Sequence, residues 1–174
     1  MFVKNEIIKI IKNLSNNIIT LDLDSNYREL VLNNSKLENV YELGGSGSSK
    51  GFNLFQKKVD VNKFRKFFKR KNISYFIGEN NNIIKYKKTL IRDILISTKG
   101  KAYIYGDIKK SDLKHFETII KRYTTDYIIK EYKQGYIIEI NCKNIKKLFF
   151  KNKIFYLKDT VVEIKDFISD LLLN

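Results

Sequence analysis

The alternation of hydrophobic and polar residues predicts helices and short strands along the whole chain. Apolar residues recur at helical spacing in 3–14, 59–70 and 86–97, and again in a segment that Ser111 can cap. Short runs rich in Ile, Val, Tyr and Phe predict strands. In chain order these are 18–23, 29–32, 40–43, 73–77, 101–107, 126–133, 136–141 and 154–157. The pattern predicts an α/β fold, a mixed sheet with flanking helices, plus a small α+β C-terminal extension.

The length of 174 residues suits one sizeable domain with an appended subdomain. We divide the chain into an N-terminal helix over 1–15, an α/β core over 16–108 and a C-terminal α+β extension over 109–174. A helix or turn near 143–149 and a last helix, with Thr160 and Glu163 at capping-box spacing, complete the extension.

The charge is strongly and unevenly basic. The formal net charge is +15, and residues 50–92 hold thirteen Lys/Arg against two Asp/Glu, whereas residues 1–49 hold five against six. Such an excess predicts a polyanionic partner. The abundance of Ile, Asn, Lys, Tyr and Phe, with no Pro or Trp, indicates an AT-rich genome such as that of an organelle, a virus or certain bacteria.

Several classes of function are disfavoured by what the chain lacks. Cys142 and His115 are the single cysteine and the single histidine, so neither an intramolecular disulfide nor a zinc site of the usual Cys/His kind can form. A Ser-His-acid triad would depend on His115, which lies among lysines on a predicted helix and is interpreted as a surface residue. There is no apolar run of roughly 18 residues and no signal-peptide layout, so we expect no membrane partner.

The segment GGSGSSKGF, residues 44–52, contains four of the eight glycines and admits three interpretations. It resembles an engineered linker, although it continues without a break into the lysine-rich segment. As an enzyme loop it resembles a nucleotidyltransferase signature, with Gly45-Ser46 followed by Asp60-Val61-Asn62, but the second acid is Asn62 and a two-metal site needs clustered carboxylates. A phosphate-binding GxxxxGK[ST] loop does not match its spacing. As a nucleic-acid contact, its glycines and serines would let the backbone approach phosphates.

The nucleic-acid interpretation uses the whole basic region. Lysines and arginines supply sequence-independent affinity for phosphates, and Tyr75, Tyr86 and Tyr103 are candidates to stack on unpaired bases. The helix over 59–70 and the helix over 86–97 are each expected to turn their cations outward. The predicted RNA-binding residues are Gly45, Ser46, Gly47, Ser48, Ser49, Lys50, Gly51, Lys57, Lys58, Lys63, Arg65, Lys66, Lys69, Arg70, Lys71, Lys85, Lys87, Lys88 and Arg92.

Four motifs over 16–108, taken in order, resemble the small-subunit ribosomal protein eleven family. Asn16 to Asp22 resembles the family's opening strand, and Gly47 to Phe52 with the lysines beyond resembles its glycine-serine-lysine loop. Leu90 to Leu95 resembles its second helix, and Tyr103 to Ile108 its final strand and aspartate.

The resemblance implies an α/β core that binds rRNA through the loop and the basic helices, without catalysis, cofactor, metal or small-molecule substrate. The implied partners are rRNA and neighbouring small-subunit ribosomal proteins, and the implied location is a mitochondrial ribosome with an organelle-encoded gene. The chain departs from the family at 79–82, where Glu-Asn-Asn-Asn replaces a glycine-rich turn, and after Asp107, where the family's tail is missing. The alternatives are a viral or plasmid DNA/RNA-binding accessory protein and, third, a degenerate nucleotidyltransferase.

Overall fold

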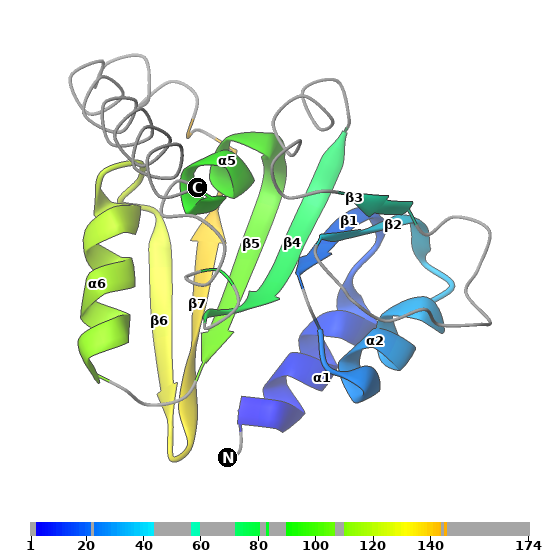
Figure 1. The fold of residues 1–174 in the computed structure, drawn as a ribbon, viewed down its shortest axis with the longest axis horizontal. Helices are drawn as coiled ribbons and strands as arrows, with labels where there is room; N and C mark the ends of the chain where they lie inside the picture. The colour runs from blue at the N-terminus through cyan, green and yellow to red at the C-terminus, as the bar shows by residue number, and fades with distance from the viewer. Residues whose placement is uncertain are drawn as a thin grey trace, which may run out of the picture.

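The computed structural model describes residues 3–21, 23–43, 57–59, 72–80, 83, 90–106, 110–143 and 145. The described helices and strands follow one another along the chain as shown in Figure 1. They are α1 (Val3–Asn13), β1 (Asn16–Leu21), α2 (Ser25–Leu32), β2 (Leu37–Leu43), β3 (Lys57–Val59), β4 (Ile73–Glu79), α5 (Leu90–Ser97), β5 (Thr98–Gly106), α6 (Lys110–Lys121), β6 (Tyr127–Tyr132) and β7 (Gly135–Asn141).

The strands form one seven-stranded sheet in the order β3-β2-β1-β4-β5-β7-β6. The ladders joining β3, β2, β1, β4 and β5 are parallel, while β7 runs antiparallel to both β5 and β6. The order first moves outward from β1 to β3 and then returns to the other side of β1 with β4. The prediction of an α/β fold with a mixed sheet and flanking helices is therefore confirmed.

Helices cover both faces of the sheet, and each face has its own core (Figure 1). On one face, α1 and α2 bury Ile7, Ile11 and Val31 against sheet residues that include Ile18 and Ile77. On the other face, α5 and α6 pack on the opposite side of the same strands. Alternate residues of β1 show the division, because Ile18 belongs to the first core and Ile19 to the second.

The helix α2 replaces a strand that the sequence pattern predicts at 29–32, and that prediction is wrong. Asp24 is the N-cap of α2, and its side chain accepts a hydrogen bond from the backbone N–H of Tyr27 at 2.9 Å. Tyr27 and Val31, four residues apart, are buried on the same side of the helix. The short apolar run Leu30 to Leu32 gave a strand-like pattern, whereas the cap and the i, i+4 spacing decide for a helix.

The C-terminal strands extend the same sheet and do not form a second sheet of their own. β7 pairs along its length with β5, from Tyr136 opposite Gly106 to Asn141 opposite Lys101. Gly135 lies so close to β5 that an added Cβ would come within 2.5 Å of the Gly106 carbonyl oxygen. In the described part of the chain, the predicted boundary between 108 and 109 thus falls inside one sheet.

The other predicted elements are confirmed where the structure describes them, with shifted ends. The helix predicted over 86–97 is described from Leu90, and the strand predicted over 101–107 begins at Thr98. The helix predicted over 59–70 is wrong at its first residue, because Val59 ends β3, and residues 60–70 lie outside the described residues. The strand predicted over 154–157 and the last helix are also outside them, as is most of 143–149. None of the described helices is long and apolar enough to cross a membrane.

Candidate ligand site at the switch point of the sheet

The strand order creates one position where polar side chains from several strands converge. The chain leaves β1 for α2 on one face of the sheet, and it leaves β4 for α5 on the other face. Because β1 and β4 are parallel neighbours, their carboxyl ends lie at the same edge with the connections diverging to opposite faces. Open α/β sheets bind ligands at the carboxyl ends of strands at such a switch point.

A buried ion pair lies at the carboxyl end of β2, one strand away from this point. Glu42 is paired in register with Thr20 of β1, and its side chain is 2% exposed. The Arg28 guanidinium of α2 donates from Nη2 to the Glu42 carboxylate, and the Arg28 side chain is 22% exposed. The Arg28 Nε is buried and has no hydrogen-bond partner among the described residues. The pair therefore places two groups beside the switch point, the Glu42 carboxylate as an anionic acceptor and the Arg28 Nε–H as a donor.

Two tyrosines occupy the α1/α2 face between α2 and β5. The rings of Tyr27 and Tyr105 meet edge to face, with their centroids 5.8 Å apart. Burial raises the pKa of both hydroxyls, and the negative charges of Asp24 and Glu79 raise them further. Both hydroxyls consequently stay protonated near neutral pH and remain available as hydrogen-bond donors.

A buried amide lies directly after β4, toward the α5/α6 face. The Asn80 side chain donates from Nδ2 to the hydroxyl oxygen of Tyr136 on β7. The Asn80 Oδ1 is buried and accepts no hydrogen bond from the part of the chain that the structure describes. A buried acceptor without a partner costs about 1–3 kcal/mol, so this oxygen is suited to an N–H or O–H donor of a bound molecule.

Most of the residues predicted from the sequence to bind RNA cannot be placed. The loop residues 45–51 and the cations at 63–71 and 85–88 lie outside the described residues, so their role in RNA binding stays a prediction. Lys57 and Lys58 belong to β3, at the edge of the sheet. Asp60 and Asn62, at the two acid positions of the nucleotidyltransferase signature, are likewise outside the described part. Within the described part, no group of three or more His, Cys, Asp or Glu could hold a metal ion.

Arg92 does not face outward as its helical position predicted. It lies on α5 and is 1% exposed, and its Nε donates to the carboxylate of Asp93 at 3.1 Å. The periodicity of α5 placed Arg92 next to the inward residues Leu90 and Ile91, all three of which are buried. The prediction of an outward Arg92 is wrong because the buried arc of α5 is wider than a single apolar stripe.

Comparison with known proteins relates the fold to methyltransferases. No protein-family model matches the chain, and no curated protein is similar to it in sequence. Among solved structures, an rRNA methylase from Streptococcus thermophilus superposes with a TM-score of 0.59 and 11% identity, over 81% of this chain and 96% of that one. A putative methyltransferase from Streptococcus mutans in complex with SAH gives a TM-score of 0.53 and 12% identity, over 81% and 97%. A putative ribosomal RNA methyltransferase from Plasmodium falciparum gives 0.51 and 8%, over 81% and 96%.

These findings contradict the resemblance to small-subunit ribosomal protein eleven and the structural role in a ribosome that it implied. The rRNA methylase structure covers 81% of this chain, which is more than the segment 16–108 that the ribosomal resemblance matched. The same comparisons contradict the structural ribosomal role and the expected lack of enzymatic activity, because these three solved structures are described as methyltransferases, two of them as putative. The motifs misled because a strand, a loop, a helix and a strand recur in many α/β folds, and each motif matched at that level only.

The structure from Streptococcus mutans contains SAH, and the polar groups of that molecule can be matched with the residues at the switch point of this chain. A ribose carries two hydroxyl donors and ether and hydroxyl acceptors, which match the Glu42 carboxylate and the buried Arg28 Nε. An adenine or ammonium N–H matches the buried Asn80 Oδ1. The connection from β1 to α2, Asp22 to Asp24, contains no glycine, and Leu23 is 5% exposed. A ligand at this turn would therefore contact side chains, because without glycine the backbone is less open to close approach.

The sequence contained one signal for this site that the motif comparison did not use. A buried strand ends at Leu21 and is followed by Asp22 and Asp24, and an acid at the end of the next strand, Glu42, comes about twenty residues later. An acid at that spacing is typical of nucleotide-binding α/β units. It was obscured because the strand at 29–32 was predicted where a helix lies.

Proposed function

We propose that the chain is an S-adenosylmethionine-dependent methyltransferase that acts on RNA. The observation that supports this most directly is the buried Glu42–Arg28 pair at the carboxyl end of β2, beside the switch point of a methyltransferase-like sheet. A buried ion pair is costly to desolvate and is weakly justified by stability alone. Recognition of a ribose gives it a function at the position where such sheets bind nucleotides.

The roles of the chain's residues follow from their donors and acceptors. Bound S-adenosylmethionine supplies an activated methyl group to a nucleophilic atom of the acceptor. Glu42 accepts hydrogen bonds from the ribose hydroxyls, while Arg28 holds the carboxylate in place and offers Nε as a donor. Asn80, oriented by Tyr136, offers Oδ1 to an N–H or O–H of the cofactor or the acceptor.

RNA is the favoured acceptor because of charge. The net charge of +15 favours a polyanion over a small neutral substrate. Two of the solved structures of similar fold are described as rRNA methylases, one of them as putative. The sequence-based expectation of RNA as a partner is thus retained, whereas the expectation of no small-molecule substrate is replaced by the cofactor. The mitochondrial location stays an untested prediction.

Cofactor binding is the first test. Isothermal titration of the purified chain with S-adenosylhomocysteine should give saturable binding, and Glu42→Gln should weaken it about 10- to 100-fold, as expected for lost hydrogen bonds to a charged group. Glu38→Gln is the matched control, because Glu38 lies on the same strand but is exposed. Equal affinities of the two variants, both shown to be folded by circular dichroism, would contradict the assignment of Glu42.

Methyl transfer is the second test. Tritium from methyl-labelled S-adenosylmethionine should enter total RNA and be released by ribonuclease. If the label entered protein or a small molecule instead, the assignment of RNA as the acceptor would be wrong. No transfer to any acceptor, despite tight cofactor binding, would reject the enzymatic proposal.

A further inference from the structure

We infer that the α1/α2 face of the sheet, toward the amino ends of β4 and β5, binds single-stranded RNA. The surface, here called the sheet-face patch, consists of Tyr75, Lys101, Tyr103, Lys130 and Glu139. It is separate from the switch point, and the inference rests on the proposed RNA substrate.

The five residues lie on one face of four neighbouring strands. Tyr75 of β4 pairs in register with Lys101 of β5, and Tyr103 pairs with Glu139 of β7. Lys101 and Tyr103 are two residues apart on β5 and therefore point to the same side. Lys130 of β6 reaches the same surface, because its Nζ contacts Glu139.

The patch is left open by the helices that cover the rest of this face. α2 packs over the end of the sheet that includes Val40, and α1 packs toward the carboxyl end of β5, near Tyr105 and Ile137. Lys101 and Lys130 keep 47% and 44% of their side chains exposed, and both tyrosines are half-buried. On the neighbouring position of β6, Ile128 is 58% exposed, which makes it the most exposed large hydrophobic residue of the described chain.

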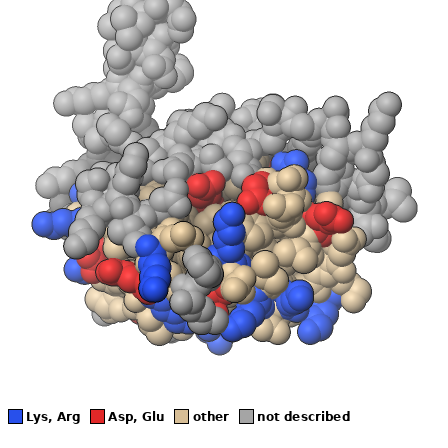
Figure 2. Space-filling view, turned by 90° about the horizontal axis from the view of Figure 1, so that it is seen from below, with Lys and Arg blue, Asp and Glu red and all other residues tan. Residues whose placement is uncertain are grey.

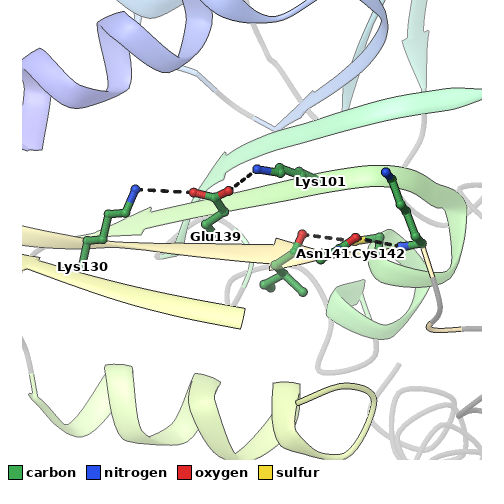
Figure 3. Close-up of polar contacts among 7 residues, drawn as sticks. Lys101, Lys130, Glu139, Asn141 and Cys142 are labelled. Atoms are coloured by element: carbon green, nitrogen blue, oxygen red, sulfur yellow. Dashed lines mark hydrogen bonds and ion pairs between the residues drawn. The ribbon is translucent and has the colours of Figure 1, made fainter. Parts of the chain in front are cut away.

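The two lysines are held in position by a shared acid. Lys101 donates to one oxygen of Glu139 at 2.5 Å, and Lys130 contacts the other oxygen at 3.5 Å, so Glu139 lies between them (Figure 3). Each ammonium has three donors, of which Glu139 uses one. The remaining N–H groups of Lys101 and Lys130 can therefore donate to a molecule bound at the patch.

The tyrosines suit unpaired bases. Diagonal neighbours on adjacent strands lie within reach of aromatic side chains, so Tyr75 and Tyr103 can offer two ring faces to successive bases. Burial and the charge of Glu139 raise the pKa of the Tyr103 hydroxyl, which keeps the ring neutral. A flat sheet face with aromatic residues and nearby cations is a known way of reading single-stranded RNA.

Charge favours RNA over a protein partner at this position. The patch has two exposed cations for one acid, and the acid is already paired. Figure 2 shows that Lys and Arg lie among Asp and Glu over the described part of the molecule seen from below. Aromatic faces beside cations match stacked bases and phosphates, and the exposed Ile128 adds apolar surface next to them.

The test measures RNA binding without cofactor, by fluorescence anisotropy of a labelled 12-nucleotide single strand of mixed sequence and of its duplex. Tyr75→Ala/Tyr103→Ala should weaken single-strand binding about 10-fold or more, whereas Tyr75→Phe/Tyr103→Phe should bind normally, because stacking uses the ring. Lys101→Ala/Lys130→Ala should lower the slope of log K against log salt by about 1.4, since each phosphate contact contributes about 0.7. Glu139→Gln should strengthen binding by releasing both ammonium groups.

The lysine and glutamate variants keep the test decisive even if the alanine replacements at the tyrosines unfold the chain. Unchanged affinity and salt slope in folded variants would overturn the patch, and so would equal losses for single strand and duplex. Normal methyl transfer to RNA together with unchanged binding by patch variants would reject the patch alone. Patch-dependent RNA binding without any methyl transfer would reject the proposed function and leave the patch.

Discussion

Two carboxylates on the same face of the sheet are paired with cations in opposite environments. Glu42 is 2% exposed and is held by Arg28 at the carboxyl end of β2, whereas Glu139 is 19% exposed and is shared by two well-exposed lysines. The first pair has little water to screen it and the second has much. The desolvation cost of an ion pair therefore depends on its surroundings. It is high for the buried pair at β2 and low for the exposed lysines around Glu139.

The largest expected effect comes from removing the cation of the buried pair. Arg28→Met leaves Glu42 as a buried charge without its guanidinium, and we expect a loss of about 3 kcal/mol in the free energy of unfolding, measured by urea denaturation. Arg28→Met with Glu42→Leu should recover most of that loss, because the buried charge is gone. The same cycle on Lys101 and Glu139 should give a much smaller coupling. Equal coupling energies in the two cycles would remove the contrast between the regions.

The next effect concerns the buried amide near the switch point. Tyr136→Phe removes the oxygen that accepts from the Asn80 Nδ2 and leaves that buried donor without this partner. We expect a loss of about 1–3 kcal/mol in urea denaturation. Adding Asn80→Ala should reduce the loss, whereas additive losses would show that the two side chains act independently.

A smaller effect is expected at the cap that holds α2, and hence Arg28, in place. Asp24→Ala removes the acceptor for the Tyr27 backbone N–H and should cost about 1 kcal/mol. Asp24→Ser should restore most of this stability, because serine is also a favourable N-cap. If the alanine variant also weakened binding of S-adenosylhomocysteine and the serine variant did not, the cap would be linked to the buried pair.

The smallest effect is expected at Glu139, and it depends on pH. Burial raises the pKa of Glu139, but the hydrogen bond from Lys101 and the charges of both lysines outweigh it, so the pKa is lower than usual. A lowered pKa in the folded state gives stability that is present above the unfolded value and is lost as the pH falls through the folded value. Wild type should therefore exceed Glu139→Gln by at most about 1 kcal/mol at pH 7 and converge with it toward pH 3. A difference that grew on acidification would contradict this assignment.

The sequence was sufficient for the local elements and for the fold class. The helical spacing of Ile7 and Ile11 predicted α1, and alternating Ile, Tyr and Phe predicted β4 and β5, because side-chain burial on one face repeats with the period of each element. It misassigned α2, where the Asp24 cap and the i, i+4 spacing of Tyr27 and Val31 outweighed the apolar run Leu30 to Leu32.

The site was harder to predict from the sequence than the fold, because its residues are far apart along the chain. Arg28 and Glu42 are 14 residues apart along the chain, and Asn80 and Tyr136 are 56 residues apart. No local sequence pattern indicates that the members of either pair are in contact. The composition determined that the chain is basic and suited to a polyanion. Only the tertiary structure decided which carboxylate is buried and which is shared by surface lysines, because that depends on strand order and on which helix covers each end of the sheet.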